Sequence, residues 1–416
     1  MISDILNKRA MKNPHKGFIT YENKQISYAQ FNSMVNNYYD TLKTKKHKYV
    51  GLQIKDKLKL LIAIIALNRK KSIPVIYPNH PNIEEYLYTT KTPVVIKDFK
   101  LIVCGENFFH RQYVYDEKDT QLVMFTSGSS GNPKPCELTY GNFNESSKIW
   151  DEIIQFNHND VYLNHMPLTH VSGMCIFFRA LYSNFEIILD DFNINNYIKY
   201  SQRATLVSMV PAMLEMICNN IKDTRLQQMK AVIVGGDNIN NKLIEKIKTN
   251  KIPAYVSYGL TESCSGIAGA WISEFSKNLV YNAHQQVTIS LADKALTIIS
   301  PTIIKKYFNS KKLFNNRFIT SDCVEIIEKN KFKFKNRLDD IVVSGGENIS
   351  INYVKKQLLK YKGVKSCSIE IINDKRWDKA MHAILVIEKN IDKQKFQKNI
   401  IKLLPKHMIP KKITIQ

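Results

Sequence analysis

A dense run of hydroxyl residues, glycines and a lysine directly follows the apolar segment 121–125. Glycine lets the backbone approach an anion with its N–H groups exposed, hydroxyl groups add hydrogen-bond donors, and lysine supplies positive charge. The run therefore predicts a phosphate-binding loop, with a polar surface turn as the alternative. It fits neither the Walker loop nor the G-x-S-x-G nucleophile elbow. The residues of the run that could contact phosphate are Thr126, Ser127, Gly128, Ser129, Ser130, Gly131 and Lys134.

A carboxylate stands at a comparable place, after the strand-like segment 254–257. Carboxylate oxygens are the ligands that Mg2+ prefers in proteins. Glu262 is therefore a candidate magnesium ligand, and a solvated loop carboxylate is the alternative. The residues that lead up to it are Ser257, Tyr258, Gly259, Leu260 and Thr261.

Two further places carry residues that could belong to a binding site. Gly235 and Gly236, followed by Asp237, come after an apolar segment, where a simple turn is the alternative. Asp322 and Arg337 lie on either side of a strand-like stretch. A carboxylate is a good acceptor for the two hydroxyls of a vicinal diol, but both residues are equally well explained as surface charges.

A histidine and an arginine occur within one apolar stretch. His170 is followed by Val171, Ser172 and Gly173. A lone histidine is more often structural than functional, so its neighbours have to decide its role. Arg179 is a candidate partner for a carboxylate of a ligand, and an arginine that pairs on a helix surface is the equal alternative.

The elements that must position these residues alternate between helix-like and strand-like segments. This alternation predicts parallel α/β structure in the first part of the chain. Helices are expected at 28–42 and through 67, and strands at 49–54, 73–77, 121–125, 161–166, 186–189, 206–210, 231–234 and 254–257.

The pattern of apolar and polar residues changes after residue 279. Short alternating runs up to about 334 predict antiparallel strands or a small β-barrel. The pattern then restarts as a small α+β unit with strands at 341–343, 366–372 and 382–387 and helices at 351–361 and 393–404. We therefore expect a large N-terminal domain over 1–336, a hinge at 337–340 that includes Asp339, and a small mobile domain over 341–416.

Composition excludes several classes of protein. With 44% hydrophobic and 10% aromatic residues in 416, the chain is globular rather than disordered. The longest apolar run, Leu60 to Leu67, is too short to span a membrane, and no secretory signal is present, so a cytoplasmic protein is expected. Seven cysteines without a C-x-x-C pair suit neither a disulfide framework nor a zinc site. The net charge of +23 comes from lysines along the whole chain, which disfavours one nucleic-acid stripe.

Taken together, these segments resemble the acyl-adenylate-forming superfamily of acyl- and aryl-CoA synthetases, adenylation domains and luciferases. The run TSGSSGNPK is similar to its phosphate-loop signature, and three more motifs follow in the family's order. They are YGLTE for its Y-G-x-T-E motif, TSD at 320–322 for its T-G-D motif, and NRLD at 336–339 for its G-R-x-D hinge. The resemblance implies an AMP-forming ligase that uses ATP, Mg2+ and CoA.

The resemblance implies a role for each residue of the nucleotide site. Thr126 and Lys134 would hold the departing phosphates together with the 127–131 loop, and Glu262 would hold Mg2+. Asp322 and Arg337 would bond the ribose hydroxyls. The adenine would lie against Gly235, Gly236 and Asp237, beside Ser257, Tyr258, Gly259 and Thr261.

The resemblance also implies an acyl pocket and a thioester site. His170 would line and gate the acyl pocket, with Ser172 and Gly173 beside it. Amino-acid-activating relatives carry, at the position of Val171, an aspartate that pairs with the ammonium group of the substrate. A free amino acid is therefore a poor substrate candidate for this chain. Arg179 would suit a second carboxylate on the acid. The loop at 345–346, Gly345-Gly346, would take part in thioester formation after a rotation about the hinge.

Within the superfamily, the stretches PLTHVSG and VSGGENI are most similar to the o-succinylbenzoate-CoA ligases of menaquinone biosynthesis. One departure is that no P-x-x-x-x-G-K segment occurs before Gln416; Lys411 and Lys412 match a different part of that motif. Loss of such a lysine would raise the activation free energy of adenylation by about 2.7 to 4 kcal/mol, so slow adenylation is expected. Asn336 and Ser321 replace family glycines.

Three alternatives stay open at this point. The chain could be another aryl- or acyl-CoA ligase, or it could transfer the acyl group to the thiol of a carrier protein instead of CoA. The chain could be a degenerate, non-catalytic protein that binds a nucleotide or an acyl-adenylate. Nucleic-acid binding rests only on the charge of +23.

Overall fold

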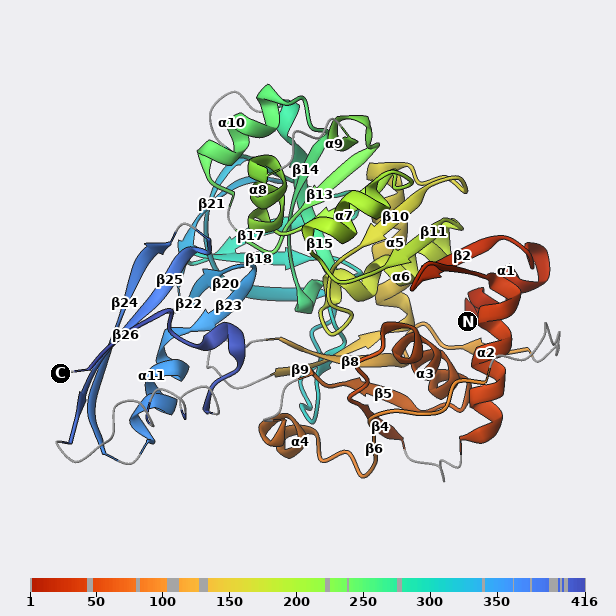
Figure 1. Ribbon diagram of the computed structural model, residues 1–416, viewed down its shortest axis with the longest axis horizontal. Coiled ribbons are helices and arrows are strands. Elements are labelled where there is room, and N and C mark those ends of the chain that lie inside the picture. The colour runs from red at the N-terminus through yellow and green to blue at the C-terminus, as the bar shows by residue number, and fades with distance from the viewer. Residues whose placement is uncertain are drawn as a thin grey trace.

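The structure is a computed structural model of the chain (Figure 1). It describes residues 2–42, 48–79, 83–102, 112–126, 134–220, 225–237, 239–274, 279–338, 341–361, 363–374, 376–388, 396, 399 and 403–415. No helix within these ranges is long and apolar enough to cross a membrane.

The larger sheet is mixed. Its parallel strands are short apolar runs, such as Ala-Val-Ile-Val in β13, which are buried because helices cover both faces. Antiparallel strands continue the sheet at both ends. In order across the sheet, the strands are β17 (Thr288–Ala292), β18 (Ala295–Ile299), β20 (Arg317–Glu328), β21 (Lys331–Arg337), β16 (Tyr281–Ala283), β15 (Ser265–Trp271), β14 (Ala254–Leu260), β13 (Ala231–Val234), β12 (Leu206–Met209), β10 (Val161–Asn164), β11 (Glu186–Leu189), β2 (Gly17–Tyr21) and β3 (Lys24–Ser27).

The smaller sheet carries the segment that leads into the phosphate-loop run. In its middle, β8 pairs with β5 in parallel and with β9 in antiparallel orientation. The strand order is β19 (Lys306–Tyr307), β9 (Lys134–Thr139), β8 (Thr120–Thr126), β5 (Ile73–Ile76), β4 (Tyr49–Leu52) and β6 (Val95–Ile96). A separate short pair joins β1 (Ile2–Ser3) to β7 (Val114–Tyr115).

Helices pack against both sheets and build the main core. Helix α3 is apolar on nearly every side because it lies inside this core, as its run from Leu60 to Leu67 predicts. Side-chain caps set several helix starts, as Ser27 does for α2. The helices before residue 250 are α1 (Ile5–Lys12), α2 (Tyr28–Thr41), α3 (Lys57–Arg69), α4 (Glu84–Thr90), α5 (Tyr140–Ile154), α6 (Val171–Ser183), α7 (Ile194–Ser201), α8 (Pro211–Asn220), α9 (Arg225–Gln228) and α10 (Asn241–Thr249).

The last part of the chain builds its own apolar core. Val354 and Leu358 of α11 pack against Leu385 and Phe396. Figure 1 shows this C-terminal unit, which we define as residues 341–415, at the left of the view, in blue. Its elements are the hairpin β22 (Ile341–Ser344) and β23 (Glu347–Ser350), the helix α11 (Ile351–Leu359), and a sheet of β24 (Val364–Asp374), β25 (Asp378–Ile387) and β26 (Lys412–Ile415).

The structure confirms the mixed α/β class and refines several elements. The strands expected between 279 and 334 are antiparallel; β16, β17, β18, β20 and β21 are hydrogen-bonded at the end of the larger sheet, and β19 joins the smaller sheet. Sequence patterns missed β23 and β26 in the C-terminal unit. Most of the helix expected at 393–404 lies outside the described residues, and so does Asp339 of the expected hinge.

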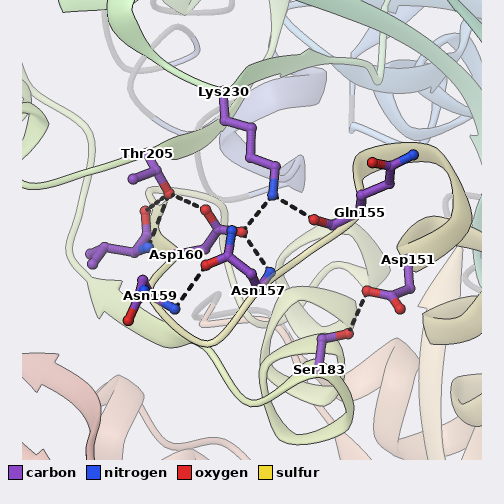
Figure 2. Close-up of polar contacts among 9 residues, drawn as sticks. Asp151, Gln155, Asn157, Asn159, Asp160, Ser183, Thr205 and Lys230 are labelled. Atoms are coloured by element: carbon purple, nitrogen blue, oxygen red, sulfur yellow. Dashed lines mark hydrogen bonds and ion pairs between the residues drawn. The ribbon is translucent and has the colours of Figure 1, made fainter.

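One buried carboxylate fastens the starts of three parallel strands (Figure 2). Asp160, just before β10, accepts hydrogen bonds from Thr205 Oγ1 at 2.9 Å and from the backbone N–H of Asn157 at 2.8 Å. Its Oδ2 also lies 2.8 Å from Lys230 Nζ. Thr205 and Lys230 directly precede β12 and β13. The network therefore aligns these strands at the end of the sheet opposite to the strand ends that carry the candidate residues.

We expect Asp160→Ala to lower the free energy of unfolding by about 2 to 3 kcal/mol, because it leaves a half-buried ammonium and two further donors without their charged acceptor. Chemical denaturation measures this change. Asn159→Ala is the control, since that side chain is exposed on the same turn. Equal stability of the two variants would contradict the role given to Asp160.

Candidate active site

The carboxyl ends of strands from both sheets meet at a cavity of about 1180 Å³, which the C-terminal unit also lines. Parallel strands bring the residues that follow them to one edge of a sheet, and ligands bind at that edge. Of the residues singled out from the sequence, the cavity is lined by Thr126, Lys134, His170, Ser172, Arg179, Gly235, Gly236, Asp237, Ser257, Tyr258, Gly259, Thr261, Glu262, Asp322, Arg337, Gly345 and Gly346.

A few singled-out residues are not part of this lining. Ser127 to Gly131 lie outside the described residues. Gly173 is buried behind the cavity wall, where a Cβ atom would come within 2.4 Å of the carbonyl oxygen of Pro167. Close packing of α6 against the segment before it therefore requires glycine at this position.

A carboxylate, a phenol and an ammonium form one corner of the cavity. Thr126 and Lys134 lie opposite each other on β8 and β9. Tyr307 on β19 donates a hydrogen bond of 2.8 Å to Glu262 Oε1, and Lys134 Nζ lies 6.0 Å from the centre of the Tyr307 ring. Burial raises the pKa of Glu262, whereas the hydrogen bond from Tyr307 and the charge of Lys134 oppose this shift.

This corner suits Mg2+ bound together with phosphate. Mg2+ in nucleotide sites takes one or two protein carboxylates and completes its shell with phosphate oxygens and water. Glu262 supplies one buried carboxylate, and within the described ranges no group of three or more His, Cys, Asp or Glu side chains gathers around a common point. A cation here would also favour the charged form of Glu262, which burial disfavours.

A second polar cluster lies where β20 and β21 pair. Asp322 and Arg337 face each other across these strands, with Arg337 Nη1 3.1 Å from Asp322 Oδ1. Tyr258 on β14 donates a hydrogen bond to Asp322 Oδ2. Burial, together with the charge of Asp322 and this hydrogen bond, raises the pKa of Tyr258, so the phenol keeps its proton. The carboxylate of Asp322 is thus held in one orientation.

The glycine pair after β13 touches the C-terminal unit. The backbone N–H of Gly346 donates a hydrogen bond of 3.2 Å to Asp237 Oδ2. Gly236 and Gly346 both have a positive φ, of 84° and 86°. At Gly346 a Cβ atom would also lie 2.7 Å from Val210 Cγ1. Both turns therefore require glycine, and they bring two backbones close together beside the cavity.

An ion pair crosses the cavity mouth between the same two parts of the chain. His170 precedes α6, and its Nε2 lies 3.0 Å from Oε1 of Glu347 in the C-terminal unit. Burial lowers the pKa of His170, but the charge of Glu347 and their hydrogen bond outweigh it and raise this pKa. Burial likewise opposes ionisation of Glu347, yet the charge of His170 holds the pKa of Glu347 at about 2.

A buried guanidinium lies in another wall of the cavity. Arg179 is 2% exposed, donates a hydrogen bond of 2.8 Å from Nη2 to Ser265 Oγ, and stacks 4.4 Å from the centre of the Trp150 ring. A further hydrogen bond joins Arg179 to the side chain of Tyr162. The Nε of Arg179 has no hydrogen-bond partner, and no carboxylate in the described part of the chain forms an ion pair with it. Arg179 therefore presents a buried positive charge to whatever fills the cavity.

Sequence reasoning missed several residues of this site. Tyr307, Trp150 and Ser265 carry no local signal, because a tyrosine, a tryptophan or a serine in a strand or helix is ordinary. Glu347 does carry one, since it directly follows Gly345 and Gly346.

Comparison with known proteins adds three likenesses. The family model described as AMP-binding enzyme matches residues 71–290. A 2-succinylbenzoate–CoA ligase of Bacillus subtilis is 25% identical over 316 residues; the match covers 71% of this chain and 65%, just under two thirds, of that relative. A double mutant of o-succinylbenzoate CoA synthetase from Bacillus subtilis, bound with its product analogue OSB-NCoA, has a TM-score of 0.87 at 20% identity, over 100% of this chain and 95% of the other.

A second solved structure of that synthetase is less similar to this chain. Its complex with ATP and magnesium ion has a TM-score of 0.74 with this chain at 20% identity, over 100% of this chain and 96% of the other. The structure described above is therefore more similar in its overall arrangement to the complex with the product analogue.

We expect Glu347→Gln to lower the pKa of His170, because the substitution removes the negative charge that raises it while burial still lowers it. An NMR titration of the imidazole signals, assigned with His170→Ala, measures this pKa. Since the folded protein raises this pKa, the ion pair is fully formed below the ordinary pKa of histidine and is lost as pH rises through the raised value.

Glu370→Gln is the matched control for this titration. Glu370 faces His382 elsewhere in the C-terminal unit, so its loss should leave His170 unchanged. The assignment of Glu347 as the partner is wrong if His170 titrates identically in the Glu347→Gln variant and the unsubstituted protein.

Proposed function

Because the chain belongs to the AMP-binding enzyme family, we propose that it is an ATP- and Mg2+-dependent acid–CoA ligase whose acid carries a second carboxylate. The observation that carries this substrate class is the buried, incompletely paired guanidinium of Arg179 in the cavity wall. A bidentate carboxylate would satisfy its open N–H groups and its charge. The 2-succinylbenzoate–CoA ligases, which this chain resembles, are named for such an acid.

The reaction has two steps. First, a carboxylate oxygen of the acid attacks the α-phosphorus of ATP, and pyrophosphate leaves, which produces an acyl-adenylate. Second, the thiol of CoA attacks the acyl carbon, loses its proton, and displaces AMP, which leaves the thioester. Both steps concentrate negative charge, so catalysis consists mainly of positioning and electrostatic stabilisation.

The described residues supply the groups that the first step requires. Thr126 and Lys134 would bind the departing pyrophosphate, because a hydroxyl and an ammonium converge there on one corner. Glu262 would hold Mg2+, which neutralises phosphate charge when bound. Asp322, fixed by Tyr258 and Arg337, would accept hydrogen bonds from the ribose hydroxyls.

The second step would use the contacts between the two parts of the chain. His170 lies at the cavity mouth and is held by Glu347, so it would define where the acyl group meets the incoming thiol. The loop at Gly345 and Gly346 would line the thiol's path because its bare backbone fits close to Val210. Between the two steps the C-terminal unit would rotate about a hinge at Asp339.

Glu262→Gln should lower the rate of acid-dependent pyrophosphate exchange by about a hundred- to a thousandfold. The amide keeps the hydrogen bond from Tyr307 but loses the charge that would hold Mg2+. Isotope exchange between pyrophosphate and ATP, with o-succinylbenzoate as the acid, measures this step. Glu274→Gln, in an exposed position outside the cavity, is the matched control. Full exchange activity in Glu262→Gln would remove the assigned metal role.

Arg179→Gln should lower kcat/KM for a dicarboxylic aryl acid by about ten- to a hundredfold, the usual worth of a hydrogen bond to a charged group. The same variant should change kcat/KM little for the acid that lacks the second carboxylate. AMP release in the presence of ATP, Mg2+ and CoA measures both.

The control for this measurement is Arg203→Gln, which removes a half-exposed guanidinium that pairs with Glu186 away from the cavity. An equal loss with both acids would reject the second carboxylate as the partner of Arg179. ATP binding without AMP release for any acid would instead favour a non-catalytic binding protein, and acylation of a carrier protein but not of CoA would change the proposed acceptor.

A further inference from the structure

A phenol–carboxylate hydrogen bond joins the C-terminal unit to the smaller-sheet side of the cavity. Tyr353 on α11 donates a hydrogen bond of 2.6 Å from its hydroxyl to Glu85 Oε2 on α4. Tyr353 is 6% exposed, and both residues line the cavity. This contact joins α11 to α4, whereas the pair of His170 and Glu347 joins β23 to the segment before α6.

Local structure holds the phenol in place. Ser350 caps α11 by accepting a hydrogen bond of 3.2 Å from the backbone N–H of Tyr353. Gln357 and Lys360 also line the cavity. Gln357 lies four residues after Tyr353 and Lys360 three residues after Gln357, so all three lie on the same face. Burial, together with the hydrogen bond to Glu85 and its charge, raises the pKa of Tyr353, so its hydroxyl remains a donor at neutral pH.

Glu85 is linked in turn to the strand that ends at the phosphate-loop run. The ring of its neighbour Tyr86 meets Phe125 edge-on, with 4.9 Å between ring centres. Phe125 directly precedes Thr126 at the end of β8. A shift of α11 relative to α4 would therefore break a short hydrogen bond close to the residues assigned to pyrophosphate.

We infer that Tyr353 and Glu85 are positioning residues of the acyl-transfer step, because their hydrogen bond stabilises the arrangement in which the C-terminal unit closes the cavity. The inference rests on the proposed function. The TM-score of this chain is 0.87 with the double mutant of the synthetase bound with its product analogue and 0.74 with the synthetase in complex with ATP and magnesium ion. A rotation of the C-terminal unit away from α4 would break the bond, so adenylation in another arrangement would not depend on it.

Tyr353→Phe tests this inference with the full-length protein, because it removes only the hydroxyl. We expect acid-dependent exchange of pyrophosphate into ATP to stay within about twofold, since adenylation does not need the contact. Single-turnover transfer from preformed acyl-adenylate to CoA should slow about tenfold, the usual effect of one lost hydrogen bond to a charged group. Tyr361→Phe is the matched control, because that hydroxyl bonds only within the C-terminal unit among the described residues.

A second pair of variants separates the hydrogen bond from packing. Glu85→Gln keeps an acceptor for the Tyr353 hydroxyl and should retain more acyl transfer than Glu85→Ala. Thermal unfolding of each variant shows whether the fold is intact. Equal slowing of both half-reactions, or unchanged acyl transfer in Tyr353→Phe, overturns the inference while the proposed function stands. Absence of pyrophosphate exchange in the unsubstituted protein overturns the proposed function, and the inference falls with it.

Discussion

The pairing of β14 with β13 and β15 is the interaction on which the site depends. β14 runs parallel to β13 and antiparallel to β15, and the register shifts between Tyr258 and Gly259. At Gly259 a Cβ atom would lie 2.1 Å from the carbonyl oxygen of Ser265, so the two backbones can approach this closely only with glycine there. This close approach brings the end of β14, with Glu262 beyond it, next to the Ser265 that orients Arg179.

Glu262 is held between the two sheets. It follows β14 of the larger sheet, while its backbone carbonyl accepts a hydrogen bond of 2.9 Å from the N–H of Ile304, and its side chain bonds Tyr307 of the smaller sheet. Asn142, which forms a capping box with Thr139 at the start of α5, donates hydrogen bonds to the carbonyl oxygens of Pro301 and Ile303 and so anchors the same connecting segment. A carboxylate fixed from both sides needs little reorganisation when charge develops nearby, which is the condition for electrostatic catalysis.

Two buried arginines show how structural and functional charges differ in this fold. The guanidinium of Arg69 has an ion pair with Asp4 and further hydrogen bonds to Asn32 and Asn36, so the fold itself satisfies it. Arg179 contacts the hydroxyls of Ser265 and Tyr162 and one aromatic face, but no carboxylate among the described residues, and its Nε is unbonded. A buried charge without an ionic partner lowers the stability of the fold unless a ligand of opposite charge pairs with it. Next to a cavity, such a charge favours the binding of an anion.

By itself, the sequence determined the alternation of helices and strands, because apolar periodicity and turn residues act over short distances. It also indicated which segments line the cavity, because glycines, hydroxyls and Glu262 follow recognisable strand ends. Only the tertiary structure decided their partners. Tyr307 reaches Glu262 from 45 residues away and Ser265 reaches Arg179 from 86 residues away. The tertiary structure also decided that Gly173 packs against the backbone at Pro167, because the position of α6 against the preceding segment is set by packing and not by a local sequence pattern.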